Sequence, residues 1–207
     1  MRILACVFIL LILLVGCSVE GKDSEPEEID KPANIILTPV DLYKGNAKKF
    51  RPFLGAMSGA FKIEYKGIKP NAHLDIDIWE NGEKVSSAGS VGDLFFWPEE
   101  EASNELEIII AFDTISIEGQ DQYKEIKINL IDGSGSSFIT STTPWDEKYG
   151  PHGLISIGET RTFPAKGAVH VWGMHATSTN SIRVADLSPE SLSTLEKAII
   201  FTLRFEE

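Results

Sequence analysis

The residues best suited to binding chemistry lie in an aromatic and charged segment at 144–152, Pro-Trp-Asp-Glu-Lys-Tyr-Gly-Pro-His. Trp145 and Tyr149 stand there among acidic and basic side chains, and His152 ends the segment. Exposed aromatic rings beside polar groups suit stacking on a sugar or contact with a protein, and binding segments are often loops on a rigid scaffold. We therefore select this loop as the candidate binding site. The alternative is that Trp145 and Tyr149 cap the end of the hydrophobic core.

A strand expected at 168–174 supplies two further candidates. Alternation places Val169 and Val171 on one of its faces, and His170 and Trp172 on the other. We add His170 and Trp172 to the candidate binding residues because they could come near the 144–152 loop.

Three histidines fall late in the chain, namely His152, His170 and His175. Zinc requires three or four nitrogen, sulfur or oxygen ligands that converge, and the spacing of these histidines does not demand convergence. We expect neither a metal nor a cofactor. A metal-binding protein that uses the late histidines stays open as an alternative.

Asp75 and Asp77 share one face of another expected strand, together with His73 and Trp79. Two carboxylates at this spacing can act as an acid–base pair in the hydrolysis of a glycan or contribute Ca²⁺ ligands. The alternative is a solvated outer face. The chain lacks H-E-x-x-H, G-x-S-x-G, S-x-x-K and the phosphate-binding G-x-x-x-x-G-K-[ST]. We therefore favour a non-enzymatic function and keep a carboxylate-dependent hydrolase of envelope polymers as the runner-up.

The N-terminal segment is strongly apolar. Met1 and Arg2 precede an apolar run at 3–15, which is short for a membrane span of about 20 residues and has the length of a secretory signal. The run ends at Leu14-Val15-Gly16-Cys17, which resembles a bacterial lipobox. In that family diacylglycerol is joined to the Cys sulfur and a signal peptidase cuts just before it. The resemblance implies that residues 1–16 are a signal peptide and that Cys17 is the lipidated first residue.

A lipobox implies an extracytoplasmic protein that is held at the membrane by diacylglyceryl-Cys17. Two acyl chains give stable retention, whereas one is marginal. Ser18 follows the cysteine, and in that family a residue other than Asp permits sorting to the outer membrane where the cell has two membranes. Cys6 leaves with the signal, so Cys17 is the only mature cysteine. A disulfide and thiol catalysis within the mature chain are thereby excluded.

Composition divides the rest of the chain into a tether and one domain. Residues 17–33 are acidic and nearly free of apolar side chains, so we expect a disordered tether, and residues 34–207 form the expected single domain. Loss of residues 1–16 removes Arg2 and no acid, so the formal charge falls from −12 to −13. This charge argues against a nucleic-acid partner. The only basic cluster lies in an expected loop at 43–52, and we interpret it as local charge balance, with membrane contact through the acyl chains alone.

Alternating apolar residues predict some ten short strands. The clearest segments are 57–66, 74–79, 106–112, 126–130 and 198–205. Asn81-Gly82 predicts a hairpin, and Ser188-Pro189 predicts the start of one short helix before the last strand. The expected fold is an all-β antiparallel β-sandwich of immunoglobulin-like or jelly-roll type. The strand–helix–strand ending resembles immunoglobulin-type sandwiches, a resemblance of architecture that implies no activity.

These expectations combine into one functional hypothesis. The chain is expected to be an exported, lipid-anchored protein whose β-sandwich is a binding or accessory module. Its partner is expected to be an envelope glycan or another protein, and its oligomeric state is open. The candidate residues are Cys17 for lipidation and Trp145, Tyr149, His152, His170 and Trp172 for binding.

Overall fold

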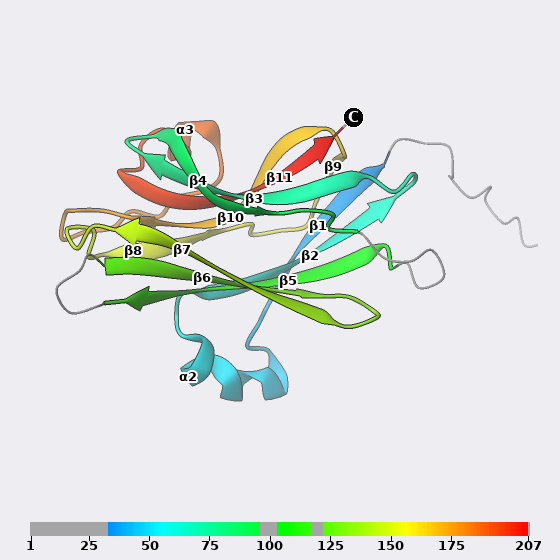
Figure 1. Ribbon diagram of the computed structural model, residues 1–207, viewed down its shortest axis with the longest axis horizontal. Coiled ribbons are helices and arrows are strands. Elements are labelled where there is room, and N and C mark those ends of the chain that lie inside the picture. Colours follow the sequence, from blue (N-terminus) through cyan, green and yellow to red (C-terminus); the bar gives the residue numbers. More distant parts are fainter. Residues whose placement is uncertain (1–32, 96–102, 117–121, 207) are drawn as a thin grey trace, which may run out of the picture.

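Two antiparallel β-sheets pack face to face in the computed structural model, which describes residues 33–95, 103–116 and 122–206 (Figure 1). The expected all-β sandwich is confirmed. The six-stranded sheet has the order β7-β6-β5-β2-β1-β9. Its strands are β1 (Asn34–Val40), β2 (Ser58–Lys66), β5 (Glu105–Ile115), β6 (Gln122–Ile131), β7 (Ser136–Trp145) and β9 (Arg161–Pro164). The predicted lipobox and nearly all of the predicted tether lie outside the described residues.

The five-stranded sheet has the order β4-β3-β11-β10-β8. Its strands are β3 (Asn71–Glu80), β4 (Glu83–Val91), β8 (His152–Ser156), β10 (Gly167–Ala176) and β11 (Lys197–Glu206). Asn81 and Gly82 form the expected hairpin turn between β3 and β4, with φ values of 52° and 79°. A Cβ on Gly82 would lie 2.1 Å from the Ser193 carbonyl oxygen, so the turn requires glycine for space as well as for φ.

One hydrophobic core fills the space between the sheets. The alternating residues of the long strands supply it, as the sequence predicts. Its largest fully buried side chains include Phe61 of β2, Phe201 of β11 and Trp172 of β10. Phe112 and Trp172 stack across the interior, with ring centroids 5.5 Å apart and planes 15° apart. This contact joins β5 of one sheet to β10 of the other.

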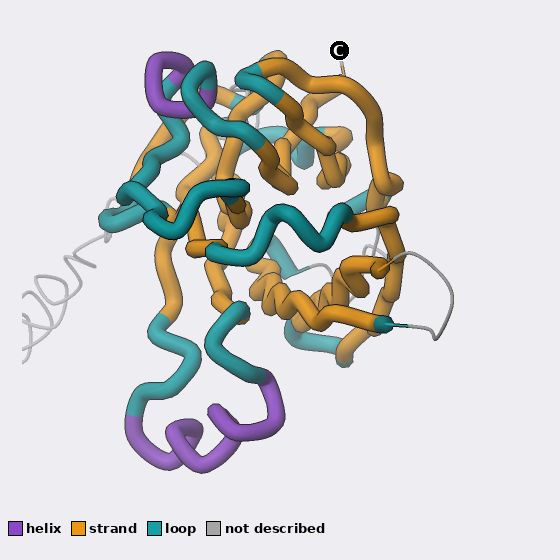
Figure 2. Tube along the Cα trace, turned by 90° about the vertical axis from the view of Figure 1, so that its left-hand side faces the viewer, coloured by secondary structure: helices purple, strands orange, loops and turns teal. Residues whose placement is uncertain are grey.

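The expected short helix is confirmed as α3 (Pro189–Leu192), where the Ser188 side chain accepts a hydrogen bond from the Ser191 amide at 3.3 Å. The expected loop at 43–52 is wrong in part, because it contains the 3₁₀ helix η1 (Gly45–Phe50), followed by α2 (Arg51–Leu54). These two helical turns protrude from the strands as a separate projection (Figures 1 and 2). No helix among the described residues is long and apolar enough to cross a membrane.

Candidate functional site

A cleft of about 780 Å³ opens at one end of the sandwich, where the edge strands of the two sheets approach each other. β7 is an edge of the six-stranded sheet and β4 is an edge of the five-stranded sheet. The Ser141 hydroxyl of β7 donates to the Ala88 carbonyl of β4 at 2.5 Å and joins these edges. Farther along, Thr143, Pro144 and Trp145 of β7 line the cleft. The other lining residues are Ile78, Glu80, Ser86, Gln122, Asp146, Glu147, Lys148, Tyr149 and Lys197.

Trp145 forms part of the wall of the cleft and belongs to the core, with 3 % of its surface exposed. The expectation of an exposed Trp145 is therefore wrong, and the alternative that it caps the core describes its position. Its ring lies under two buried ammonium groups. Nζ of Lys124 (β6) is 5.3 Å and Nζ of Lys197 (β11) is 5.8 Å from the ring centroid. Both distances are within cation–π range, so one indole ring links a lysine from each sheet.

Each lysine also has a polar partner. Lys124 Nζ donates to the Thr114 hydroxyl at 2.7 Å, and Lys197 Nζ lies 2.5 Å from Glu80 Oε1. Burial lowers the pKa of Lys124, and the carboxylate of Asp113 partly opposes this shift. Lys197 lines the cleft together with its partner Glu80, so a ligand would meet this ion pair directly.

The rim of the cleft is a turn that follows β7. The Tyr149 amide donates to the Asp146 carbonyl at 3.1 Å, and the Lys148 amide donates to Asp146 Oδ1 at 2.9 Å. The Lys148 ammonium lies 3.0 Å from Asp146 Oδ2. The hydrogen bonds from the Lys148 backbone and side chain lower the pKa of Asp146. Tyr149 is half-buried, and its ring centroid lies 5.9 Å from that of Trp145.

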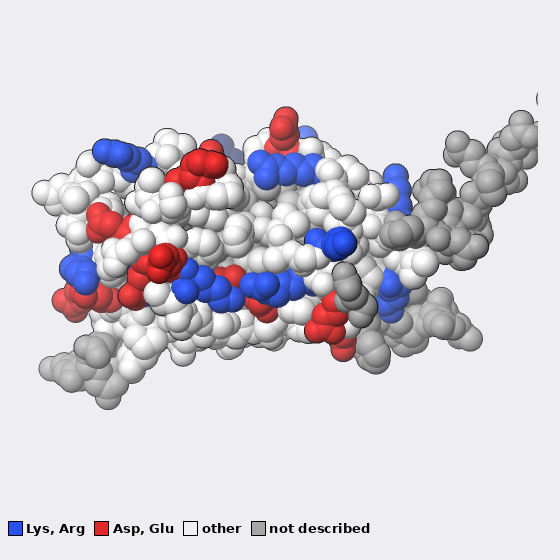
Figure 3. Space-filling view, turned by 90° about the horizontal axis from the view of Figure 1, so that it is seen from above, with Lys and Arg blue, Asp and Glu red and all other residues white. Residues whose placement is uncertain are grey.

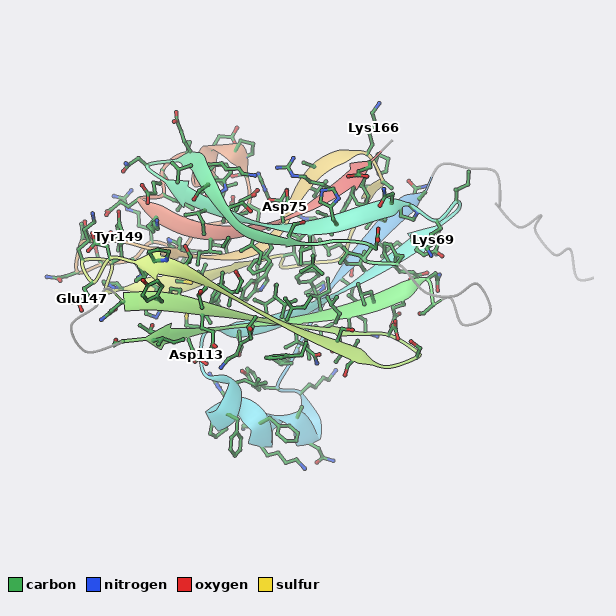
Figure 4. All side chains as sticks on the ribbon, in the orientation of Figure 1. Lys69, Asp75, Asp113, Glu147, Tyr149 and Lys166 are labelled. Carbon is green, nitrogen blue, oxygen red and sulfur yellow. The ribbon has the colours of Figure 1, made fainter. Side chains whose placement is uncertain are left out.

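Glu147 and Tyr149 both lie at the end of the sandwich where β7 and β8 meet (Figure 4). Oε1 of Glu147 accepts a hydrogen bond from the Gln122 amide nitrogen at 3.1 Å. The structure therefore brings together Trp145 and Tyr149 from the predicted set. It adds Glu80, Gln122 and Lys197, which the sequence presents only as polar residues of strands. Their position depends on which strands pair and on where the two sheets meet.

The other predicted residues lie elsewhere. His152 is exposed at the start of β8, where its Nδ1 donates to the Gly150 carbonyl at 2.8 Å. Trp172 is 2 % exposed and stacks in the core. Gly59 allows this position, because a Cβ there would lie 2.8 Å from Trp172 Nε1. Trp172 belongs to the core and also lines a small cavity of about 140 Å³, which is separate from the cleft beside Trp145.

His170 and Trp172 do not share a face of β10. The register against β11 shifts between them, so that His170 pairs with Thr202 and Trp172 pairs with Phe201. This β-bulge adds one residue, and the side chains two positions apart turn to opposite faces. Trp172 points into the core, while the His170 ring lies edge-on to the ring of Trp79, with centroids 5.5 Å apart.

His170 belongs to a polar network on the outer face of the five-stranded sheet. Thr202 Oγ1 donates to Asp77 Oδ2 at 2.8 Å and lies 2.9 Å from His170 Nδ1. Since the hydroxyl proton is directed to Asp77, His170 Nδ1 is the donor to Thr202. Burial lowers the pKa of His170, Asp77 raises it, and Arg204 and Lys84 lower it further.

The carboxylates of Asp75 and Asp77 are paired with cations. Asp75 Oδ2 lies 2.5 Å from Arg204 Nε, and Asp77 Oδ1 lies 2.5 Å from Lys84 Nζ. Burial alone would raise the pKa of Asp75, but hydrogen bonds from Ser90 and Arg204 and the charge of Arg204 outweigh it, so the pKa is lowered. A general acid needs a raised pKa. Figure 3 shows acidic and basic side chains side by side on this face. Because Asp75 and Asp77 are both paired with cations, their arrangement does not favour the carboxylate-dependent hydrolase.

The third late histidine, His175, lines a smaller cavity of about 370 Å³ beside residues 177–185. Burial lowers its pKa. Within the described residues, no group of three or more His, Cys, Asp or Glu side chains is arranged to hold a metal ion.

Comparison with known proteins identifies no relative: no protein-family model, no curated protein and no solved structure matches this chain.

Proposed function

We propose that this protein is an exported membrane lipoprotein, anchored by diacylglyceryl-Cys17, whose β-sandwich binds an envelope glycan in the cleft beside Trp145. The lipobox sequence supports the anchor. The location that follows is extracytoplasmic, at the cell membrane or, where the cell has two membranes, at the outer one. The observation that carries the binding function is the cleft itself, whose volume of about 780 Å³ lies in the range of small-ligand sites.

The charges in the cleft indicate the chemistry of the ligand. Lys197 is paired with Glu80, and Lys148 is paired with Asp146. Glu147 adds a third carboxylate, so the cleft presents three acidic and two basic side chains, which suit a ligand with many hydroxyl groups better than a polyanion. The half-buried ring of Tyr149 adds an apolar surface at the rim. A neutral oligosaccharide matches both features.

The test is a titration of the full chain, purified in mild detergent, with soluble glycan fragments from the envelope of the producing cell. Binding is measured by calorimetry. Glu147→Ala removes an exposed rim carboxylate and is expected to weaken binding about tenfold, the effect of losing one charged hydrogen bond. Glu190→Ala removes an exposed carboxylate from α3 and is the matched control, with no effect expected. Absence of glycan binding, or equal binding by both variants, would contradict the proposal.

A further inference from the structure

The projection at residues 44–55, which we call the helical lobe, exposes apolar side chains that are not packed into the core. It contains η1 and α2, and neither has a buried residue. Phe53 is 86 % exposed and Phe50 is 51 % exposed. Elsewhere in the described chain most phenylalanines lie in the core. Two adjacent exposed aromatic rings on a projection indicate a contact surface.

The lobe is held in place at its neck. The Tyr43 hydroxyl, at the entrance, donates to the Gly55 carbonyl at the exit, at 2.9 Å. Ser58 Oγ donates to the same carbonyl at 2.9 Å and also contacts the Tyr43 hydroxyl. Gly55 has a φ of 75°, a backbone conformation that favours glycine. The chain therefore enters and leaves the lobe at a fixed junction, and the lobe projects as one unit (Figure 2).

The lobe is basic although the whole chain carries a formal charge of −12. It has no acidic residue, and its cations are Lys44, Lys48, Lys49 and Arg51. The Lys49 ammonium lies 5.2 Å from the ring centroid of Phe50, so a cation and an exposed ring stand together. Basic side chains next to exposed aromatic rings are the composition of a segment that lies in the interface of an anionic bilayer.

The position of the lobe allows such contact by a tethered domain. The described chain begins at Ala33, and β1 leads from there to the lobe. β1 has seven residues and a length of about 23 Å. The chain from Cys17 to Ala33 reaches about 55 Å when it is fully extended. An anchor at Cys17 therefore leaves enough chain for the far end of β1 to touch the same membrane.

We propose that the helical lobe docks onto an anionic lipid surface, with Phe50 and Phe53 inserted at the interface and the four cations at the level of the headgroups. This departs from the expectation that the acyl chains alone make membrane contact. The choice of the same membrane rests on the proposed anchor, whereas the affinity of the lobe for anionic lipid does not. A convex projection with long basic side chains matches a bilayer surface better than the pocket of a protein partner.

The experiment uses the full chain reconstituted into vesicles that contain brominated lipids, which quench tryptophan at the interface. Phe53→Trp places a reporter on the lobe. Val184→Trp is the control, because Val184 is a fully exposed apolar residue outside the lobe, between β10 and α3. In vesicles with anionic lipid, the fluorescence added at position 53 is expected to be lost, and that added at position 184 is expected to persist.

Charge reversal tests whether the cations of the lobe, rather than the net charge of the protein, cause the contact with anionic lipid. Lys48→Glu with Lys49→Glu, in the Phe53→Trp background, is expected to restore the quenched fluorescence. Lys69→Glu with Lys166→Glu makes the same change in net charge at exposed positions away from the lobe and is expected to leave quenching intact (Figure 4). The lobe has no buried residue, and Lys69 and Lys166 are exposed, so none of these changes should alter the unfolding midpoint.

Three results would overturn the proposal. These are equal quenching at positions 53 and 184, equal quenching at position 53 in purely zwitterionic vesicles, and quenching that persists after reversal of Lys48 and Lys49. Positions 53 and 184 are compared in otherwise identical full chains, so the comparison does not depend on the form of the N-terminus. The proposed anchor is tested separately by the mass of the N-terminal peptide, which shows whether Cys17 carries a lipid.

Discussion

The ammonium group of Lys197 lies 5.8 Å from the ring centroid of Trp145, and both residues are almost completely buried. β11 and β7 belong to different sheets, so this contact holds the two sheets together at the mouth of the cleft. Glu80 supplies the counter-charge at 2.5 Å. The pair thus serves both the packing of the core and the lining of the candidate site.

Truncation of Trp145 should destabilise the protein strongly. Trp145→Ala removes a buried ring and two cation–π contacts, so we expect the free energy of unfolding to fall by about 3–5 kcal/mol. Trp145→Phe keeps an aromatic face and should cost clearly less. Urea unfolding of the full chain measures both. Equal losses for the two variants would contradict the packing role of the ring.

Removal of Glu80 should cost more than removal of its partner. Glu80→Gln leaves the ammonium of Lys197 buried without a counter-charge, and we expect a loss of about 1–2 kcal/mol, because Glu80 is 45 % exposed and water screens part of the effect. Lys197→Met replaces the buried cation with an apolar chain that still packs on Trp145, so its cost should be smaller. The double variant should resemble Lys197→Met alone. A larger loss for Lys197→Met than for Glu80→Gln would refute this assignment.

Gly59 should not tolerate a side chain. A Cβ there would lie 2.8 Å from Nε1 and 2.9 Å from Cζ2 of Trp172, whose ring is held by Phe112 and Phe201. We expect Gly59→Ala to lower the free energy of unfolding by about 1–3 kcal/mol through overpacking. Gly158→Ala is the control, because a Cβ at Gly158 meets nothing within 4 Å. Thermal unfolding of the two variants should therefore differ, and matching midpoints would be evidence against a rigid Trp172.

The segment at 177–178 should loosen in acid. Hydrogen bonds from Thr177 and from the backbone and side chain of Ser178 lower the pKa of Glu196 to about 2, from an ordinary value of 4.5. Because the folded pKa is depressed, this stabilisation is complete above pH 4.5 and is lost as the pH falls toward 2. The protection factor of the Ser178 amide, which compares its exchange rate with the intrinsic rate at the same pH, should fall in that window. Glu196→Gln should show fast exchange at neutral pH, and slow exchange in that variant would disprove the role of the carboxylate.

Much of the fold follows from local sequence. Ile199, Phe201 and Leu203 are buried in β11 as predicted, and Phe201 packs on Phe112 and Trp172 in the core, because one face of a strand repeats every second residue. Asn81 and Gly82 form the predicted turn because both positions accept a positive φ. These features depend on neighbouring residues, which explains why they can be predicted from sequence.

The candidate site could be predicted only in part. Composition identifies the aromatic loop, but the burial of Trp145 depends on Lys124 and Lys197, which come from two other strands. The bulge between His170 and Trp172 reverses the face of every later residue in β10, and simple alternation contains no sign of it. The sequence predicts a loop where the helical lobe lies. The two helical turns are short and have no buried face, so they leave no periodic pattern of apolar residues.

Substitution of Cys17 tests the proposed lipid anchor in cells. Cys17→Ala removes the proposed attachment site of diacylglycerol, so we expect release of the protein from the membrane or accumulation of an unprocessed precursor. Fractionation followed by immunoblotting distinguishes these outcomes. Normal membrane retention of a processed Cys17→Ala chain would be incompatible with lipid anchoring.

The most direct test of the proposed lipid anchor is the mass of the N-terminal peptide of the protein purified from its own cell membranes. Lipid anchoring predicts a peptide that begins at Cys17 and carries the added mass of a diacylglyceryl group. A chain that begins at Met1, or a processed chain with an unmodified Cys17, would contradict it.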